Sequence, residues 1–183
     1  MTERESRLRD ANGLAEILNE MAGKIAKGRC AGAPLRLVGI RTRGVTIAER
    51  LARLLPPLVG EAVPVGAVDI TLYRDDLGQG VRWPVLHGTH IPFDVEGAEI
   101  ILVDDVLFTG RTVRAAINAV CDLGRPACVR LAVLVDRGHR EIPIQPDIVG
   151  LTAPTERDEL VRVRIAPNDS ADEIVRVGSD APN

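Results

Sequence analysis

Residues Ile100 to Thr112 read Ile-Ile-Leu-Val-Asp-Asp-Val-Leu-Phe-Thr-Gly-Arg-Thr. Four apolar residues end in two adjacent carboxylates, Asp104 and Asp105, and a short Thr/Gly segment follows. The amphipathic run beyond it carries apolar residues at helical spacing, at Val113, Ala116, Ile117 and Val120. This order predicts a buried strand, a turn that can hold a phosphate, and the start of a helix.

The chemistry of this stretch suits a phosphorylated sugar. Carboxylates at a strand end can accept hydrogen bonds from two sugar hydroxyls, or hold water on a metal. The segment Phe108–Thr112 can curl so that successive backbone N–H groups face one anion, with hydroxyl donors at Thr109 and Thr112. Gly110 permits close approach. No Gly-Lys-Ser/Thr follows, so this is not a Walker A loop.

The stretch resembles the phosphoribosyl-pyrophosphate (PRPP) motif of type I phosphoribosyltransferases. The resemblance implies that Asp104 and Asp105 hold the ribose hydroxyls. It also implies a cradle for the 5′-phosphate, made by Val106, Leu107, Phe108, Thr109, Gly110, Arg111 and Thr112. In this family the position of Phe108 is sometimes acidic, notably in purine enzymes. An aromatic residue there favours a pyrimidine substrate, or no base catalysis from this loop.

A second loop, Arg41-Thr42-Arg43-Gly44, follows the apolar run Leu35–Ile40 and opens a helix. Two guanidinium groups around a Thr/Gly turn suit a pyrophosphate. Two arginines at a helix start can equally be solvated surface residues. The PRPP motif downstream is what favours a binding role for this pair. In the family, the equivalent loop contacts pyrophosphate and often contains a cis peptide bond.

A third segment, Leu131 to Ile144, is a strand that ends in Asp136 and Arg137, with His139 and Arg140 in the loop beyond. Together with Asp69-Ile-Thr-Leu-Tyr-Arg-Asp-Asp-Leu77 it resembles the PyrR family of pyrimidine operon attenuators that are also uracil phosphoribosyltransferases. The likeness runs from about Leu37 to Pro154. Phe108 stands where many PyrR proteins carry Tyr.

The resemblance implies Mg²⁺-dependent transfer of a phosphoribosyl group from PRPP to uracil, giving UMP and pyrophosphate. The residues expected to carry catalysis are Asp104, Asp105, Arg43 and Arg137. Arg41, Thr42, Arg43 and Arg74 would hold the pyrophosphate, and Asp136 and Arg137 would border the base. The Mg²⁺ would arrive with PRPP, without a direct protein ligand, and reach Asp104 or Asp105 through water.

Other functions stay open at this point. The main alternative is an RNA-binding attenuator of pyrimidine genes that responds to uridine nucleotides such as UMP and UTP. An enzyme for another base, such as hypoxanthine, and a non-catalytic PRPP sensor are further alternatives. The PyrR signatures speak against the former, and the complete PRPP motif speaks against the latter.

Binding of an mRNA leader hairpin is expected to be weak. PyrR attenuators bind RNA through a basic dimer face, and contacts to phosphates require cations. Here the first helix carries Glu16 and Glu20, and the segment after Pro154 is acidic. The residues left for RNA are Arg137, His139 and Arg140.

Strands alternating with helices predict a mainly parallel α/β sheet of the type I phosphoribosyltransferase fold, in a single domain spanning residues 1–183. The core would cover about 33–150, and the helix 12–27 and the segment 151–178 would contribute to a small hood or the periphery. Further strands are expected at 65–72, 99–103, 129–135, 147–150 and 161–165. Pro56 and Pro57 should stop the second helix. Tyr73–Glu96 reads as a long flexible loop, either a lid or a hairpin at a dimer interface.

Composition agrees with a soluble, cytoplasmic protein, and the family resemblance implies a homodimer or a higher homo-oligomer. Of 183 residues, 45% are hydrophobic and 27% charged, with 2% aromatic and a net charge of −3. Nothing resembles a signal peptide or a membrane span. The three cysteines lack ligand spacing and are expected to be reduced thiols. His87 and His90 lack partners for a transition metal.

Overall fold

The computed structural model describes residues 4–70 and 88–178. Its main sheet has five parallel strands in the order β3-β2-β4-β5-β6. Their bounds are β2 Leu35–Ile40, β3 Val65–Val68, β4 Glu99–Leu107, β5 Cys128–Asp136 and β6 Ile148–Thr152. The chain enters at β2, moves outward to β3, and returns to place β4 on the other side of β2. The carboxyl ends of β2 and β4 therefore flank a topological switch point, where α/β sheets bind ligands.

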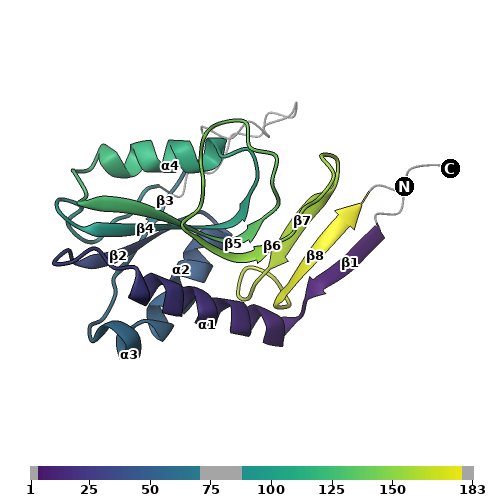
Figure 1. Ribbon diagram of the computed structural model, residues 1–183, viewed down its shortest axis with the longest axis horizontal. Coiled ribbons are helices and arrows are strands. Elements are labelled where there is room, and N and C mark those ends of the chain that lie inside the picture. The colour runs from purple at the N-terminus through teal and green to yellow at the C-terminus, as the bar shows by residue number, and fades with distance from the viewer. Residues whose placement is uncertain (1–3, 71–87, 179–183) are drawn as a thin grey trace.

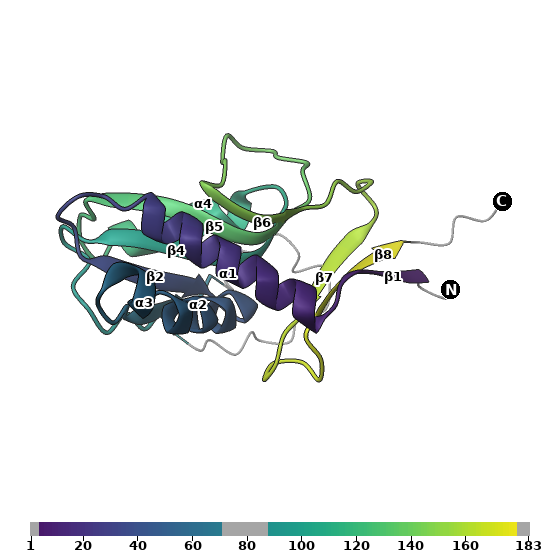
Figure 2. The same cartoon turned by 60° about the horizontal axis from the view of Figure 1, so that its bottom comes forward.

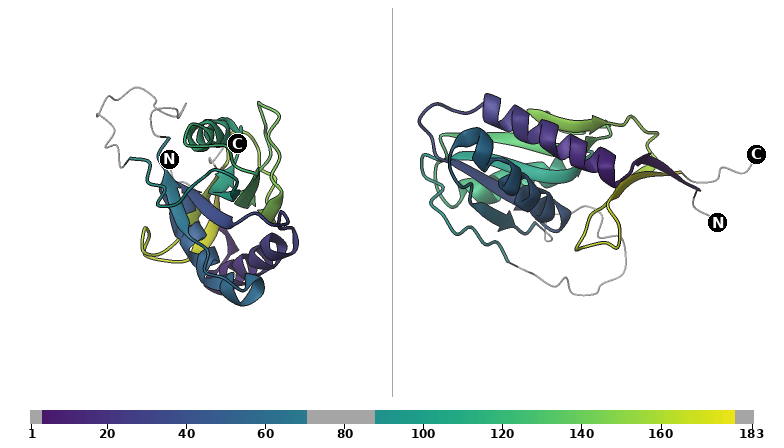
Figure 3. Two further views of the ribbon diagram at one scale, coloured as in Figure 1. Left: turned by 90° about the vertical axis from the view of Figure 1, so that its left-hand side faces the viewer. Right: turned by 90° about the horizontal axis from the view of Figure 1, so that it is seen from below.

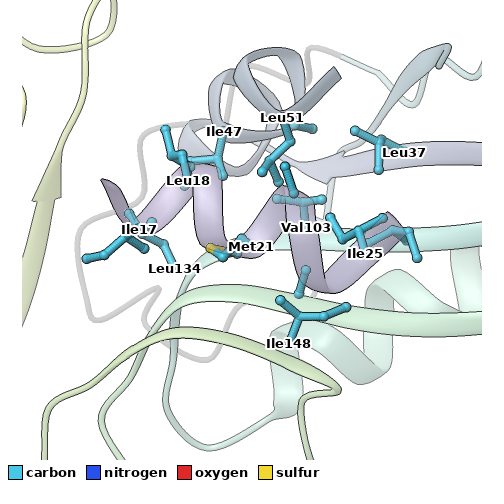
Figure 4. Close-up of a cluster of buried hydrophobic side chains, with 14 of the residues drawn as sticks. Ile17, Leu18, Met21, Ile25, Leu37, Ile47, Leu51, Val103, Leu134 and Ile148 are labelled. Atoms are coloured by element: carbon cyan, nitrogen blue, oxygen red, sulfur yellow. The ribbon is translucent and has the colours of Figure 1, made fainter. Parts of the chain in front are cut away.

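Alternation along the strands builds two apolar layers, one on each face of the sheet. Leu37, Val103 and Leu134 point to the face covered by α1 (Ala11–Lys27) and α2 (Arg43–Leu54), with α3 (Pro56–Val59) beside them. Their neighbours Val38 and Leu102 point to the other face, which α4 (Arg111–Cys121) covers. Figures 1 and 2 show the helices on opposite sides of the sheet, and Figure 4 shows the side chains of the first layer.

Residues at the two ends of α1 explain where this helix begins and ends. The Asp10 carboxylate caps the first turn by accepting a hydrogen bond from the Gly13 N–H at 2.9 Å. Its apolar stripe, which includes Leu14 and Met21, is buried against the sheet. Lys24 and Lys27 lie in the last turn, where cations stabilise a helix end.

A second sheet joins the two ends of the chain. The strands β1 (Arg4–Arg9), β8 (Glu173–Gly178) and β7 (Leu160–Arg164) are antiparallel, in the order β1-β8-β7. This sheet lies beyond the N-terminal end of α1, as the right-hand view of Figure 3 shows. Val161 and Val163 of β7 are buried, whereas Arg164 forms ion pairs with Glu5 and Glu173.

The predicted fold class is confirmed, but several bounds differ. β4 runs on to Leu107, so Asp104 and Asp105 lie inside the strand and not after it. The second helix ends at Leu54, before Pro56 and Pro57, as predicted; Pro56 then begins the short helix α3, because proline is well suited to a first helical turn. The terminal segments form β1 and β8, which were not among the strands predicted from the sequence: β1 is mostly charged, and β8, with Ile174, Val175 and Val177 buried, follows a polar, acidic run. Of the loop predicted at Tyr73–Glu96, residues 73–87 lie outside the described residues.

The cysteines depart from expectation. Cys30, in the loop after α1, is paired as a disulfide with Cys128 at the start of β5, and their Cα atoms are 7.4 Å apart. Cys121 is a free, exposed thiol. The prediction of three reduced thiols is therefore wrong for two of them. Within residues 4–70 and 88–178, no helix has the length and apolar character needed to cross a membrane.

Candidate active site

The two carboxylates of the PRPP motif lie near the carboxyl end of β4. Asp104 is buried, with 6% of its surface exposed, and its Oδ1 accepts a hydrogen bond from the Asp105 N–H at 3.0 Å. Asp105 is half-buried, and its own Oδ1 accepts from the Val106 N–H at 3.0 Å. These contacts orient both carboxylates through the backbone of the same strand.

The N-terminus of α2 is packed tightly against this point. A Cβ atom on Gly44 would lie 2.5 Å from the Val103 carbonyl oxygen and 3.3 Å from the Cα of Asp104. A Cβ atom on Gly39 of β2 would lie 2.4 Å from the Cα of Val45. Because neither position has room for a side chain, the helix start sits directly beside β4. The preceding peptide bond, Arg41–Thr42, is cis, as the family resemblance implies.

Arg43, the first residue of α2, therefore lies close to the carboxylates of β4. Its guanidinium is hydrogen-bonded to Asp169, in the loop between β7 and β8. This hydrogen bond is the main reason why the pKa of Arg43 is raised; partial burial opposes it, and the charges of Asp169 and Asp105 add to it. Arg43 thus stays protonated, paired with Asp169 and within electrostatic reach of Asp105.

The turn between β4 and α4 has the form expected of an anion cradle. Gly110, at the N-cap of α4, has φ +93°, in the left-handed region that favours glycine. The Thr109 hydroxyl accepts a hydrogen bond from the Arg111 N–H at 3.3 Å. The N-cap residue Gly110 has no side chain to cap α4, so the N–H groups that follow Arg111 in the first turn and the positive end of the helix dipole remain for an anion.

The loop after β5 braces this turn. Arg140 donates to the carbonyl oxygen of Phe108 at 3.0 Å and to Asp136 Oδ2 at 2.6 Å. Glu141 pairs with Arg111 at 3.0 Å, and its N–H donates to the Thr109 carbonyl oxygen at 3.0 Å. Asp136, expected to border the base, is thus engaged by Arg140 and by the Gly138 N–H.

Arg137 is a buried cation, with 3% of its surface exposed. Its Cζ lies 4.1 Å from the centroid of the Phe108 ring, and its nitrogens donate to Thr155 Oγ1 and the Glu156 carbonyl oxygen, each at 3.0 Å. Burial lowers the pKa of Arg137, and the charge of Glu159 partly offsets this effect. The position inside the pocket suits contact with a base and removes Arg137 from the surface available to RNA.

These elements enclose a cavity of about 490 Å³. Its walls are Asp105, Val106, Phe108, Thr109, Gly110, Arg111, Thr112, Arg137, Glu141 and Val161. The lining combines the carboxylates of Asp105 and Glu141, the start of α4, and the ring of Phe108 with the guanidinium of Arg137. Val161 comes from β7, so the second sheet closes part of the cavity. A sugar phosphate with an attached ring matches this division of polar and apolar groups.

The chain matches the phosphoribosyl transferase domain family over residues 5–161. It is 49% identical over 172 residues to the bifunctional protein PyrR of Alkaliphilus metalliredigens, covering 94% of each chain. It is 50% identical over 161 residues to the bifunctional protein PyrR of Roseiflexus sp., covering 88% of each. The chain belongs to the PyrR family. The prediction of this family, and of a phosphoribosyltransferase enzyme, is confirmed.

Solved structures of lower identity share the fold of this PyrR-family chain. The hypoxanthine phosphoribosyltransferase of Trypanosoma cruzi superposes with a TM-score of 0.69 at 21% identity, covering 93% of this chain and 95% of that one. The hypoxanthine phosphoribosyltransferase of the same organism in complex with the product IMP gives a TM-score of 0.68 at 20% identity, covering 92% of this chain and 91% of that one. At this identity the likeness is one of fold.

The structure brings most of the predicted site residues of the PyrR motif together. Arg41 is half-buried and donates to the Gly88 carbonyl oxygen at 3.2 Å, and Thr42 is exposed. Arg74 lies outside the described residues. His139 contacts the Thr155 carbonyl oxygen at 2.6 Å, and Arg140 is committed to Asp136, so both brace the pocket loop in this structure.

Sequence reasoning missed the residues that reach the site from far along the chain. These residues, Thr155, Val161 and Asp169, all lie beyond Pro154. The sequence of this segment is acidic and contains no recognisable binding motif. Glu141 was read only as part of a loop. A local pattern carries no signal for such contacts, because the partners are between 18 and 126 positions apart.

Proposed function

We propose that this PyrR-family protein transfers the phosphoribosyl group of PRPP to uracil, giving UMP and pyrophosphate. The observation that carries the proposal is identity of 49% to a PyrR protein over 94% of both chains, combined with an intact PRPP motif around one cavity. The substitution is at the anomeric carbon, with an oxocarbenium-like transition state. The protein contributes positioning and electrostatic stabilisation.

The ribose and its phosphate would lie along β4 and the start of α4. Asp104 and Asp105 accept hydrogen bonds from the two ribose hydroxyls, and their negative charge also favours positive charge developing on the sugar. The segment Val106–Thr112 surrounds the 5′-phosphate with N–H groups. The left-handed Gly110 and the uncapped start of α4 support this role, because both leave backbone donors directed at an anion.

Pyrophosphate leaves toward the start of α2. Thr42 and Arg43 would hold it, with Arg41 beside them and Arg74 as a further proposed contact. The place of Arg43 at the start of α2, beside β4, supports this role, since a permanent cation stabilises the charge that gathers on the leaving group. The uracil ring would lie against Phe108, with Arg137 and the Asp136 region bordering it.

Mg²⁺ is proposed to enter with PRPP. The donor set fits this route: Asp105 of the pocket wall and the neighbouring Asp104 offer carboxylates that can accept hydrogen bonds from metal-bound water. In the described part of the chain, a group of three residues of metal-binding type occurs at Cys30, Glu99 and Cys128, but its two cysteines are joined in the disulfide and offer no thiolate. A metal bound at the reaction site would supply charge neutralisation for the phosphates.

A second proposed function is regulation through RNA, because the related chains are named bifunctional. We further propose a cytoplasmic homodimer or higher homo-oligomer, built as one domain over residues 1–183. In this view β1, β7 and β8 form the hood over the pocket, a placement supported by Val161 in the pocket wall.

A base-specificity assay tests the leading proposal. Purified protein, Mg²⁺ and PRPP are combined with uracil, hypoxanthine, guanine or orotate, and nucleotide formation is followed for each base. We expect UMP to form fastest. A faster rate with a purine would overturn the pyrimidine assignment, and the shared fold with hypoxanthine enzymes makes that comparison the necessary control.

A further inference from the structure

The loop between β7 and β8 carries a carboxylate that fixes the arginine proposed to bind pyrophosphate. Asp169 Oδ2 accepts from Arg43 Nε at 2.9 Å, and Oδ1 accepts from Nη2 at 2.8 Å. This is a side-on, bidentate pair, which holds a guanidinium in one plane and one orientation. Asp169 is itself fixed, because its Oδ2 also accepts the Ile165 N–H at 3.0 Å.

The same loop is bonded to α2 at two further points along one face of the helix. The Thr46 hydroxyl is hydrogen-bonded to Asn168, and Arg50 Nη2 pairs with Asp172 Oδ1 at 3.0 Å. Arg50 also donates to the Ala166 carbonyl oxygen at 2.9 Å. Positions 43, 46 and 50 are spaced three and four apart, so they lie on one face of the helix. The loop and the helix therefore form one rigid unit.

Within this unit, the Arg43–Asp169 pair lies at the end of α2 that is nearest the proposed site. Gly44 is packed against the Val103 carbonyl oxygen, so the first turn of α2 cannot shift away from β4 without losing that contact. Asp105, further along β4, lines the cavity, and its charge adds to the raised pKa of Arg43. The Arg50–Asp172 pair lies two turns further along α2.

We propose that Asp169 is a positioning residue for pyrophosphate and PRPP: it holds Arg43 so that the end-on edge of the guanidinium meets the ligand. This inference rests on the proposed role of Arg43. A long arginine side chain that is already ordered loses less freedom when the ligand binds. The guanidinium can serve two anions at once because its side-on and end-on edges are distinct.

A carboxylate beside Arg43 also reduces the net positive charge that pyrophosphate meets. Asp169 could on that ground be an inhibitory residue that competes with the ligand for Arg43. An inhibitory carboxylate would have to leave when ligand arrives. Asp169 is held by a backbone N–H at the end of β7, and its neighbours Asn168 and Asp172 bind the same helix. These contacts hold Asp169 in place, so it supports Arg43 and does not leave when the ligand binds.

The test compares Asp169→Asn with the matched control Asp172→Asn. Both changes remove one charge from the same loop and weaken one pair with α2, but only the first touches Arg43. Initial rates give KM for PRPP and uracil in the forward direction, and for pyrophosphate and UMP in reverse. For Asp169→Asn we expect KM for PRPP and pyrophosphate to rise about tenfold, as the loss of a charge-assisted hydrogen bond implies. KM for uracil and UMP should change less than twofold.

The control should leave all four KM values within about twofold of wild type while lowering thermal stability to a similar extent. Asp169→Glu, which keeps the charge, should recover part of the affinity for pyrophosphate. Equal kinetic losses in both Asn variants would show a general effect of loop stability, and would overturn the inference. Tighter pyrophosphate binding by Asp169→Asn would overturn it as well, by showing that the carboxylate competes.

Arg43→Ala separates the inference from the function beneath it. If this variant keeps wild-type KM for PRPP and pyrophosphate, the proposed role of Arg43 fails. If Arg43→Ala raises both values and Asp169→Asn does not, the inference alone fails. Because Asp169 is argued to act through Arg43, Asp169→Asn should add nothing further in an Arg43→Ala background.

Discussion

At the scale of single residues, burial and backbone contacts decide what the carboxylates of β4 can do. Asp104 is nearly enclosed, and one of its oxygens already accepts a backbone N–H. Asp105 is more open and lines the cavity directly. The two adjacent carboxylates therefore present different surfaces to a sugar, although their chemistry is the same.

Asp104→Asn and Asp105→Asn should each weaken the use of PRPP while the fold stays intact. Asparagine keeps the shape and one acceptor oxygen but removes the charge. A charge-assisted hydrogen bond contributes about 1.5–3 kcal/mol, so kcat/KM for PRPP should fall roughly ten- to hundredfold. Steady-state kinetics measure this, with circular dichroism as the control for folding. Wild-type kinetics in both variants would contradict the ribose role.

The sequence is a good guide to residues whose partners are near neighbours along the chain. Asp104, Thr109, Gly110 and Thr112 lie within nine positions, so strand, turn and helix start could be read together. Asp169 could not be assigned, because its partner Arg43 lies 126 positions away. The strand beyond it carries Ile174, Val175 and Val177, an apolar signal that the acidic character of the surrounding tail obscured.

At the scale of elements, the site depends on how closely α2 approaches β4. The sequence predicted both elements from their apolar periods, but not the distance between them. That distance is set by Gly39 and Gly44, where no Cβ could be accommodated. A glycine in a helix reads as a weak position from sequence alone, because the backbone that it faces belongs to another element.

Gly44→Ala should destabilise the protein and impair PRPP use. The new Cβ would meet a carbonyl oxygen at 2.5 Å, and forced contacts in packed regions cost about 1–3 kcal/mol. Moving α2 away would also move Arg43. The control is Gly23→Ala in α1, where no atom lies within 4 Å of the new Cβ, and which should stabilise by about 0.5–1 kcal/mol. Denaturant unfolding and PRPP kinetics measure both effects, and similar values for the two variants would contradict the packing argument.

The loop between β7 and β8 should give the protein an acid-sensitive element. Hydrogen bonding to Arg50 is the main reason why the pKa of Asp172 is lowered; burial opposes it, and the Ala166 N–H adds to it. A carboxyl whose folded pKa lies below its unfolded value of about 3.9 stabilises above that pH. This stability is lost as pH falls through the lower folded pKa.

The corresponding measurement is the free energy of unfolding between about pH 6 and pH 3. Wild type should lose stability below about pH 4, and Asp172→Asn should lose less over the same range because it has no proton to take up there. Asp122→Asn, at an exposed position where α4 ends, serves as the control. An identical pH dependence in all three proteins would show that the Arg50 pair adds nothing to stability.

At the scale of the whole molecule, one covalent link ties distant parts of the chain together. The Cys30–Cys128 bridge joins residues 98 positions apart, at the amino-terminal ends of the strands and away from the cavity. Bridges of long spans restrict the unfolded chain and typically stabilise by about 2–4 kcal/mol. Sequence spacing could not reveal this pair, because β4 and β5 must first assemble to bring Cys128 beside the loop after α1.

Reduction, or Cys30→Ser, should therefore lower the midpoint of thermal unfolding by several degrees and leave kcat/KM unchanged. Melting curves with and without a thiol reductant measure the shift. Cys121→Ser is the matched control, since that thiol is free and exposed, and its melting curve should still respond to reductant. A wild-type midpoint that does not depend on reductant would show that the bridge does not contribute to stability.

The charge of the whole chain bears on the proposed second function. Net charge is −3, and the arginines of the second sheet are interleaved with acidic partners, as in the pairing of Arg164 with Glu5 and Glu173. Arg137 is buried in the pocket. Cations that are already paired with carboxylates add little net attraction for a phosphate backbone, and the binding that remains rests on phosphate neutralisation. We therefore expect weak binding of the gene's own leader RNA, with affinity falling steeply between about 50 and 200 mM salt.

Filter-binding titrations over that range of salt, with and without UMP, measure this affinity against that for a scrambled RNA of equal length. Tight, sequence-specific binding at physiological salt that UMP strengthens would show that a few well-placed cations outweigh the unfavourable total charge.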